Sequence, residues 1–440
     1  MKSLRKRRNV CRRAAAIKSG LGKLLQNGKN RPMRPQAVQR QADEALSIAR
    51  MIQRAVADGR AADQTLAAHW RANRHFGSRD RRFFSAVTFA YFRWKGWVDR
   101  ISDFPTALAA ACWLDGEINY PALTLWAELP ATLAPETALS EKANALATWQ
   151  NWERPPDIRE LFPAWTFDEL LSDGSPDFVE RIATAFQRRP PLWLRCRAGQ
   201  METVKEHLAT AGFICRADSR IENALRVEGT PGSDVLRPLT HRLAEVQDIA
   251  SQAVGIACAP KPGELWWDVC AGAGGKTLQL LDTLDQNGHV LCTDIRAVAL
   301  DELAHRAQIA GFSSFITRHV AEDPTEWAIE EQFDGILLDA PCSGIGTWSR
   351  APDARWRTTP DQISEYQLRQ LALLRYAAHQ LKPGGRLIYA VCSLAKSETI
   401  GVLEAFQAKH PTFRPTLTRS ITPDFGPGIG MWSACLENPA

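Results

Sequence analysis

Several features that would place the chain in a special class of protein are absent from its sequence. No segment approaches 18 consecutive uncharged apolar residues, and the basic N-terminus has no apolar segment behind it, so we predict neither a membrane span nor a secretory signal. The ten cysteines are sparse for 440 residues, form no CxxC pair, and show no zinc-type spacing with histidine. These absences argue against a disulfide scaffold and a metal site, and they predict a cytoplasmic protein.

Acidic residues are missing from one end of the chain. Residues 1–42 contain thirteen Lys or Arg and no Asp or Glu, although the net charge of the whole chain is only +5. A basic arm on a mildly acidic body can attract phosphate backbones without regard to sequence. A solvated disordered tail, an organellar presequence or a translation start at Met33 would explain the same composition, and the tail alone does not decide between these interpretations.

What is present predicts a multidomain protein with ordinary cores, because 45% of the residues are apolar and 23% are charged. After a basic tail over residues 1–42 that we expect to be disordered, apolar residues recur at helical spacing over residues 43–160, which predicts an all-α domain. The aromatic stripe between Arg79 and Ile101 is typical of core packing in such a domain. Residues 161–240 predict a small α+β RNA-binding or linking module, with strands at Pro190–Arg197 and Ala224–Val227 and a helix at Met201–Ala211.

The pattern over residues 241–440 predicts an α/β domain with a Rossmann-like parallel sheet. Short apolar runs that end in glycine or aspartate alternate here with segments of helical length. Ligands of such sheets bind outside the carboxyl ends of the strands. The predicted strands are Leu265–Val269, Val290–Thr293, Gly335–Leu338 and Arg386–Val391.

A glycine-rich loop, Asp268-Val-Cys-Ala-Gly-Ala-Gly-Gly-Lys-Thr277, follows the first of these strands. A Walker A loop would need glycine at position 270, which is cysteine, and a dinucleotide fingerprint would need its third glycine at 277 instead of 275. The loop better suits a nucleoside whose tail is an amino acid. Asp294 ends the second strand, where a carboxylate can accept both hydrogen bonds of a ribose diol or cap the next helix.

Two cysteines follow the next two strands. Gly335-Ile-Leu-Leu-Asp-Ala-Pro-Cys-Ser-Gly-Ile-Gly-Thr347 carries Asp339 and Cys342, and Leu387-Ile-Tyr-Ala-Val-Cys-Ser-Leu394 carries Cys392. We expect both loops to open on the same edge of the sheet. Two thiols in one cleft beside an aspartate favour a chemical role over buried filler.

These motifs are similar to motifs I, IV and VI of the RsmB/Sun/Nop family of RNA cytosine-C5 methyltransferases. The similarity covers roughly residues 190–440 and includes Val246–Ser251, Lys382–Gly385 and Pro352–Trp356. More weakly, Arg79–Lys95 resembles the NusB-like helical domain of the RsmB branch. The resemblance implies an S-adenosylmethionine-dependent enzyme that methylates RNA, with small-subunit ribosomal RNA as the expected substrate and partner. We further expect a monomer that binds neither membrane nor metal.

The resemblance also implies roles for the reactive side chains. A thiolate that adds to C6 of cytosine makes C5 nucleophilic enough to accept a methyl group, after which a base removes the C5 proton and the thiolate leaves. Cys392 corresponds to the nucleophile and Cys342 to the group that assists breakdown of the adduct. Asp339 corresponds to the acid near the N3 and N4 edge of the base, and the cation of Lys276 would favour thiolate over thiol.

Cofactor contacts and departures from the family follow from the same alignment. Val320 stands where the family has an aspartate in motif III, Ala273 replaces a proline, and Thr399 replaces an asparagine. The motif III contact is therefore unassigned. The expected S-adenosylmethionine contacts are Cys270, Ala271, Gly272, Ala273, Gly274, Gly275, Lys276, Asp294 and Asp339.

The target base must leave its stack to reach a thiolate in a cleft, and aromatic and basic side chains would support it there. Trp348 and Trp356 follow the motif IV loop and are candidates for stacking on the base. Arg350, Arg355 and Arg357 are candidates for the flanking phosphates.

Three other functions remain as alternatives. Transfer RNA or another ribosomal site could be the substrate. A DNA cytosine-C5 methyltransferase also has a P-C loop, but it lacks the second cysteine at the position of Cys392. An RNA-binding assembly factor without catalysis would account for Val320, but it would not need both thiols.

Overall fold

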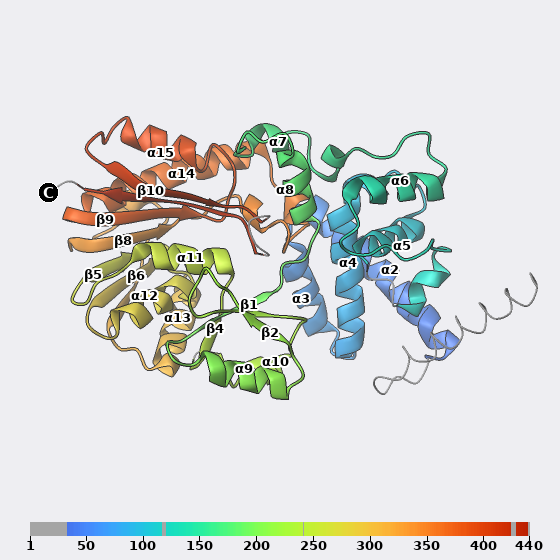
Figure 1. The fold of residues 1–440 in the computed structure, drawn as a ribbon, viewed down its shortest axis with the longest axis horizontal. Helices are drawn as coiled ribbons and strands as arrows, with labels where there is room; N and C mark the ends of the chain where they lie inside the picture. Colours follow the sequence, from blue (N-terminus) through green and yellow to red (C-terminus); the bar gives the residue numbers. More distant parts are fainter. Residues whose placement is uncertain (1–32, 117–119, 241, 424–427, 439–440) are drawn as a thin grey trace, which may run out of the picture.

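The computed structural model describes residues 33–116, 120–240, 242–423 and 428–438. Three parts follow one another along the chain, and Figure 1 shows the helical part at one end, the large sheet at the other, and a small sheet between them. Residues 1–32, most of the predicted basic tail, lie outside the described residues. None of the helices that the structure describes is both long and apolar enough to cross a membrane.

The N-terminal part is helical, as its periodicity predicts. Its first described helix begins at Pro35, inside the range assigned to the tail, and proline suits that position because its missing N–H would be unpaired there anyway. The aromatic stripe packs in the core, with Phe83, Tyr91 and Trp94 at most 1% exposed. The helices are α2 (Pro35–Ala57), α3 (Ala62–Ala72), α4 (Ser78–Val98), α5 (Phe104–Asp115), α6 (Leu139–Gln150), α7 (Thr166–Glu169) and α8 (Phe178–Phe186).

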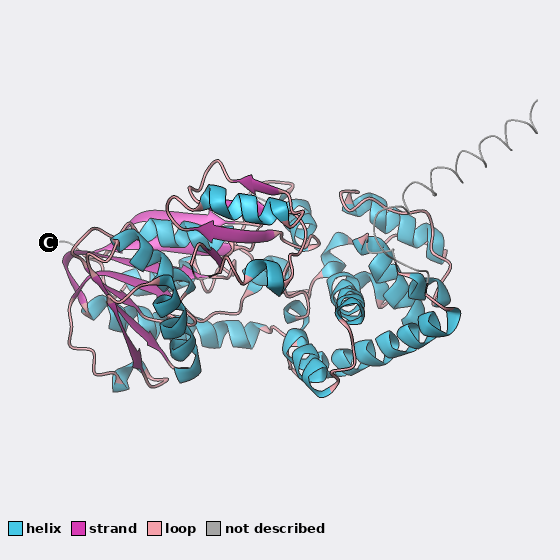
Figure 2. Ribbon diagram, turned by 90° about the horizontal axis from the view of Figure 1, so that it is seen from below, coloured by secondary structure: helices cyan, strands magenta, loops and turns pink. Residues whose placement is uncertain are grey.

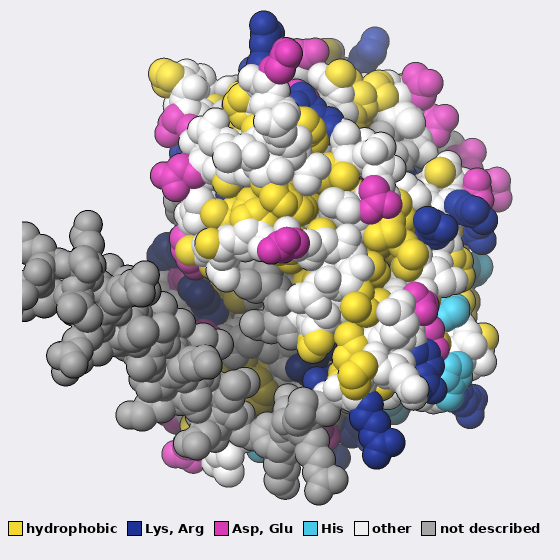
Figure 3. Space-filling model, turned by 90° about the vertical axis from the view of Figure 1, so that its right-hand side faces the viewer, with side chains coloured by type: hydrophobic (Ala, Val, Ile, Leu, Met, Phe, Trp, Pro, Cys, Tyr) yellow, Lys and Arg dark blue, Asp and Glu magenta, His cyan; other side chains and the backbone are white. Residues whose placement is uncertain are grey.

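The outer face of this helical part shows no single basic patch where it is drawn in colour. Apolar side chains form a broken band across it, and Lys and Arg alternate with Asp and Glu (Figure 3). Figure 2 shows the same helices from below, beside the sheet-containing part of the molecule.

A small antiparallel sheet forms the middle part, with strand order β2-β3-β1-β4. The predicted strands and helix all occur there, and Leu194, Val204 and Leu225 bury their side chains between them. Its elements are β1 (Leu192–Cys196), α9 (Met201–Thr210), β2 (Cys215–Ala217), β3 (Ala224–Val227), α10 (Ser233–Leu236) and β4 (Ala244–Val246).

The C-terminal part is a seven-stranded sheet with helices on both faces (Figure 1). Its order is β10-β11-β9-β8-β5-β6-β7. The strands are β5 (Leu265–Asp268), β6 (His289–Asp294), β7 (Phe315–His319), β8 (Phe333–Asp339), β9 (Leu381–Val391), β10 (Arg414–Ile421) and β11 (Met431–Glu437). The helices are α11 (Ile249–Cys258), α12 (Gly275–Leu284), α13 (Ala297–Ala310), α14 (Pro360–His379) and α15 (Ile400–Gln407).

Two features of this sheet matter for function. The five strands β5 to β9 pair in parallel, and β10 and β11, which were not among the predicted strands, add an antiparallel hairpin at one edge. The chain runs from β5 to β6 and β7 on one side and returns with β8 on the other side of β5. The ends of β5 and β8 therefore lie at a topological switch point, where ligands of α/β sheets bind.

Candidate active site

The glycine-rich loop makes a tight turn between β5 and α12. Gly272 and Gly274 have φ values of +55° and +86°, a region that L side chains rarely adopt. A Cβ atom at Gly274 would lie 2.6 Å from the Leu303 side chain, so glycine also allows the loop to pack against α13. The turn leaves the N-terminus of α12 facing the ends of the strands, where its free N–H groups suit an anionic or polar ligand.

A cavity of about 220 Å³ opens at this turn, lined by residues of the loop together with Ser251, Asp268 and Asp339. Asp268 is 1% exposed, and its Oδ2 atom accepts a hydrogen bond of 2.6 Å from Thr277 Oγ1. Its Oδ1 atom is buried without a partner. Burial raises the pKa of the Asp268 carboxyl to about 7. A buried carboxylate oxygen without a donor fits the amino group of an amino-acid ligand.

Asp294, at the end of β6, holds the glycine loop from the other side. Its Oδ2 atom accepts a 2.8 Å hydrogen bond from the Gly272 N–H, and its Oδ1 atom accepts a 2.9 Å hydrogen bond from the Arg296 N–H. Burial opposes the charge, but these hydrogen bonds and the Arg296 guanidinium lower the pKa of Asp294. Helix α13 has Arg296 at its N-cap position without a side-chain cap, so the capping interpretation of Asp294 is wrong.

Lys276 and Asp339 form a partly buried ion pair between α12 and the end of β8. The Nζ atom of Lys276 lies 2.6 Å from Oδ2 of Asp339, with the two side chains 10% and 30% exposed. Burial disfavours the ammonium, but Asp339 and the charge of Cys392 outweigh it and raise the pKa of Lys276. Lys276 therefore stays charged close to both Asp339 and the second thiol.

The two predicted cysteines meet. Their Sγ atoms are 3.1 Å apart, although Cys342 follows β8 and Cys392 follows β9. The hydrogen bond to Cys392, then burial, then the charges of Cys392 and Glu398 raise the pKa of the Cys342 thiol well above its ordinary value. Cys342 therefore keeps its proton and can donate it toward Cys392.

Comparison with known proteins finds a family that this arrangement resembles. The family model described as 16S rRNA methyltransferase RsmB/F matches residues 255–426. The curated ribosomal RNA small subunit methyltransferase B of Salmonella typhi is 32% identical over 274 residues, and its counterpart from Salmonella newport (strain SL254) is 31% identical. These matches cover 61% of this chain and span 62% of the length of those relatives. Residues 255–426 are therefore similar to the methyltransferase domain of the RsmB/F family.

Solved structures extend the comparison to most of the chain. The crystal structure of PH0851 covers 93% of this chain and all of its own, with a TM-score of 0.69 and 21% identity. A methyltransferase homolog from Pyrococcus horikoshii is 26% identical, with a TM-score of 0.52, over 59% of this chain and 90% of its own. They confirm the predicted fold class, a Rossmann-like methyltransferase domain preceded by a small α+β module and an all-α part consistent with a NusB-like domain.

NSun6 from Pyrococcus horikoshii, solved with the S-adenosylmethionine analogue SFG, shares the fold with a TM-score of 0.53 at 14% identity, over 60% of this chain and 94% of its own. The corresponding candidate site in this chain is the cavity at the glycine loop. The unpaired Asp268 oxygen and the glycine turn fit the amino-acid end of S-adenosylmethionine.

The stacking and phosphate candidates after motif IV are placed differently from the prediction. Trp348 is fully buried and packs against Phe162 and Phe186, so the expectation that it stacks on a base is wrong. Arg355 is fully buried as well and donates a 2.8 Å hydrogen bond to the Leu161 carbonyl, so it contacts no phosphate. The reason is that this loop packs into the N-terminal helical part. Trp356 donates its indole N–H to the Phe92 carbonyl in the same interface.

The two remaining arginines form ion pairs within the protein. Arg350 lies 3.0 Å from Asp248, and Arg357 lies 3.3 Å from Asp353. Arg350 is still 44% exposed, so a phosphate contact from its side chain stays a prediction.

The structure also shows where Val320 lies, the residue at the position of the motif III aspartate. Val320 is 8% exposed and packs in the core beside the sheet, while its N–H donates to the Asp294 carbonyl. Glu322 is 77% exposed and pairs with Arg369, and Asp323 accepts a hydrogen bond from Thr325 at the start of a 3-10 turn. Val320 has no carboxylate, and neither Glu322 nor Asp323 lines the cavity.

Sequence reasoning missed two buried acids of the site. Asp268 is the first residue of motif I, and its place at the end of a buried strand could have marked it as a ligand-facing carboxylate. Glu398 lies beneath the thiols and is 0% exposed. It lies six residues after Cys392 and directly before Thr399, and only the three-dimensional contacts identify it.

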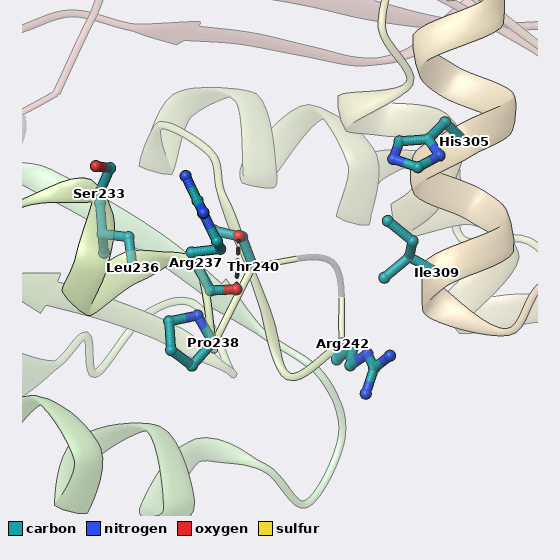
Figure 4. A pocket seen from close by; sticks show the side chains of 8 residues that line it. All are labelled: Ser233, Leu236, Arg237, Pro238, Thr240, Arg242, His305 and Ile309. Carbon is teal, nitrogen blue, oxygen red and sulfur yellow. Dashed lines mark hydrogen bonds between the residues drawn. The ribbon is translucent and has the colours of Figure 1, made fainter.

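A larger cavity, of about 830 Å³, lies away from this site (Figure 4). His305 and Ile309 line it from α13, and α10 with the following loop provides the opposite wall. The loop side carries the exposed side chains of Arg237 and Arg242. The cavity therefore lies between the small α+β module and the methyltransferase domain.

Proposed function

We propose that the chain is an S-adenosylmethionine-dependent RNA cytosine-C5 methyltransferase that acts on small-subunit ribosomal RNA through a bond between Cys392 Sγ and C6 of the base. The observation that carries the proposal is the pair of thiols 3.1 Å apart, beside the ion pair of Lys276 and Asp339. The names of the curated relatives support ribosomal RNA as the substrate.

Cofactor binding is assigned to the loop and to the acids around it. Asp268 lies at the start of the glycine turn and lines the cavity with Cys270, Ala271 and Gly275, and Asp294 accepts a hydrogen bond from the Gly272 N–H beside it. When bound, S-adenosylmethionine supplies an electrophilic methyl group. The role of this part of the chain is to hold that group at the edge of the sheet where β8 and β9 end.

The attacking step is assigned to Cys392. Its sulfur is the nucleophile that adds to C6 of the base. Asp339 is held by Lys276 through Oδ2, which leaves its other oxygen for the N3 and N4 edge of the cytosine. The hydrogen bond that this oxygen accepts from the N4 amino group holds the base in place as the sulfur–carbon bond forms.

Release is assigned to Cys342. The largest cause that keeps its proton bound is the hydrogen bond to Cys392, followed by burial and then by the charge of Cys392. A covalent bond at Cys392 Sγ removes the first and the third of these causes while burial remains, so Cys342 loses its proton more easily at the stage when the adduct breaks down. A thiolate at Cys342 can then assist removal of the C5 proton, after which the bond between C6 and Cys392 breaks and the methylated base leaves.

RNA binding is assigned in part to the cavity between the α+β module and α13. Arg237, Arg242 and His305 give it two cations and an ionisable ring on exposed positions. Such side chains suit the phosphates of an RNA strand that leads into the active site.

One alternative function is supported by a separate observation. The core position of Val320 leaves the adenine side of the site without the family's carboxylate, which is compatible with an RNA-binding assembly factor that has lost catalysis. Both thiols and the ion pair of Lys276 and Asp339 are arranged for reaction, which favours the enzyme. The second thiol also favours an RNA methyltransferase over a DNA cytosine-C5 methyltransferase.

A methyl-transfer assay tests the proposal. The purified chain is incubated with isotopically labelled S-adenosylmethionine and unmodified small-subunit ribosomal RNA, and the digested nucleosides are analysed by mass spectrometry. We expect labelled 5-methylcytidine, and label in transfer RNA instead would change the substrate. S-adenosylmethionine binding without label in either RNA would contradict the proposed reaction, and RNA binding without S-adenosylmethionine binding would favour the assembly factor.

A further inference from the structure

A buried carboxylate lies directly beneath the two thiols. Glu398 is 0% exposed and precedes α15, in the segment that follows Cys392. None of the mechanistic steps assigned above uses it. Because burying a carboxylate costs free energy unless its oxygens accept hydrogen bonds, the contacts of Glu398 indicate what it does.

The carboxylate accepts hydrogen bonds from both thiol-bearing loops. Its Oε1 atom accepts from the Ser343 N–H at 2.8 Å and its Oε2 atom from the Ser393 hydroxyl at 2.5 Å, while the Ser343 hydroxyl also donates to Oε2. Ser343 directly follows Cys342, and Ser393 directly follows Cys392. One carboxylate therefore connects the residues next to both thiols.

The rest of the molecule holds this carboxylate in place. Gln370 of α14 donates to Oε1 at 3.0 Å and also to the Pro341 carbonyl at 2.9 Å. Tyr389 of β9 donates its hydroxyl to the Glu398 carbonyl at 2.6 Å. Among the described residues, no Lys or Arg forms an ion pair with Glu398, so hydrogen-bond donors and not a counter-ion satisfy it.

The two loops need such a connection because the sheet does not supply it. Strands β8 and β9 pair in parallel as far as Asp339 and Ala390, and the thiols lie beyond the last pair. Past that point, a 3.1 Å hydrogen bond from the Gly346 N–H to the Cys392 carbonyl is a second link. The Ser343 and Ser393 hydroxyls also lie 3.3 Å apart, and the carboxylate of Glu398 binds both of them.

We propose that Glu398 is a positioning residue that ties the Cys342 loop to the Cys392 loop and so keeps the two thiols in contact. Its consequence for catalysis rests on the proposed function, but the contact between the thiols does not. A shift of about 1 Å in a reacting group can cost on the order of 100-fold in rate, so the step that needs both thiols should depend on this link.

Two substitutions separate the link from the charge. Glu398→Ala removes the acceptor and leaves the donors of Ser343, Ser393 and Gln370 unpaired. Glu398→Gln keeps the shape, and serine hydroxyls can rotate to accept hydrogen bonds from its amide, so we expect it to preserve the link. Glu264→Ala is the matched control, because Glu264 also accepts several hydrogen bonds but lies before β5, at the opposite edge of the sheet.

The direct measurement is how fast the two thiols can be joined. Without RNA, a thiol oxidant such as diamide removes one hydrogen from each thiol and is itself reduced, which leaves a disulfide between Cys342 and Cys392 that peptide mass spectrometry quantifies. We expect Glu398→Ala to slow this reaction on the order of 100-fold. Glu398→Gln and Glu264→Ala should react at nearly the rate of the unmodified protein.

Oxidation of Glu398→Ala at the unmodified rate would overturn the proposal. Equal slowing in Glu398→Gln would overturn it too, because charge and not the link would then set the contact. If Glu398→Ala does not fold, Ser343→Ala removes a hydroxyl donor on the Cys342 side only and keeps the carboxylate. We expect Ser343→Ala to slow disulfide formation as well, and an unchanged rate in that variant would count against the link.

A second measurement connects the link to turnover. With RNA and S-adenosylmethionine, we expect Glu398→Ala to lower kcat with little change in the KM for RNA, and to accumulate a covalent protein–RNA adduct as Cys342→Ala would. The double variant should behave like Cys342→Ala alone, because both changes disable the same step. If oxidation follows the prediction but the unmodified protein methylates no RNA, the link stands and the proposed function falls.

Discussion

At the scale of single residues, the site depends on how burial and neighbouring charges set protonation. Cys342 keeps its proton because of its contact with Cys392, and Lys276 keeps its charge because of Asp339. Asp268 is the opposite case, since no Lys or Arg of the described part of the chain forms an ion pair with it and burial raises its pKa to about 7. A buried carboxylate without a paired cation should strengthen the binding of a ligand that carries a positively charged group.

We therefore predict that Asp268→Asn weakens S-adenosylmethionine binding by about tenfold to a hundredfold, the range for losing a hydrogen bond to a charged group. Affinity of the unmodified protein should rise as pH increases through 7, because the ligand-binding form is the carboxylate. Isothermal titration calorimetry at pH 6, 7 and 8 measures both effects.

The same residue predicts how stability changes with pH. The raised pKa means that the folded state without ligand binds the proton more tightly than the unfolded state, so Asp268 makes folding less favourable as pH rises from about 4 to 7. Asp268→Asn should remove that part of the slope. Asp334→Asn, at the opposite end of the sheet, is the control for ligand binding. Equal ligand binding by Asp268→Asn and the unmodified protein would contradict the assignment of Asp268 to the S-adenosylmethionine site.

At the scale of elements, the strands that carry the site were predictable, and the peripheral ones were not. Strands β5, β6, β8 and β9 are apolar runs that end in aspartate or reach a cysteine, which is the pattern of strands buried on both faces. In contrast, β10 is exposed at nearly every residue and has no apolar alternation. The edge strand β7 is only partly buried.

The loop after motif IV shows a second limit of prediction. Tryptophan and arginine after a catalytic loop suggest RNA contacts, but the sequence does not show that the N-terminal helical part covers them. Arg355 lies over Phe162 at 4.2 Å from the ring centroid and donates to backbone carbonyls. A buried arginine in such an aromatic and carbonyl environment cannot be told from an RNA-binding one by spacing alone.

The packing of Trp348 gives a prediction at this scale. Trp348→Ala should destabilise the protein by about 3–5 kcal/mol, because it empties a fully buried position between Phe162 and Phe186. Chemical denaturation followed by circular dichroism measures the loss. A variant of unchanged stability that binds RNA weakly would restore the stacking interpretation instead.

At the scale of the whole molecule, the three parts meet around one edge of the large sheet. The helical part holds the motif IV loop, and the α+β module shares the cavity of about 830 Å³ with α13 (Figure 4). The motifs predicted the thiols, the glycine loop and the ion-pair residues, because those lie at strand ends. The packing between parts could not be predicted, because it joins segments far apart in the chain.

The shared cavity predicts a dependence on salt. Replacing Arg237 and Arg242 by alanine should weaken RNA binding and reduce the slope of log affinity against log salt by about 0.7 for each phosphate that the variant no longer neutralises. Fluorescence anisotropy with a labelled ribosomal RNA fragment at several salt concentrations measures the slope. Arg318→Ala, which removes an ion pair with Glu331 at the β7 edge of the large sheet, is a control for the loss of a positive charge elsewhere. An unchanged slope in the Arg237 and Arg242 variants would exclude the cavity from the RNA path.

The most direct test of the account is to trap the covalent intermediate. Cys342→Ala is incubated with S-adenosylmethionine and small-subunit ribosomal RNA, and any protein–RNA adduct is digested and mapped by mass spectrometry. We predict an adduct that accumulates on Cys392 and is absent from the variant that also carries Cys392→Ala. An adduct on another residue, or methylation by Cys392→Ala at the unmodified rate, would contradict the central claim.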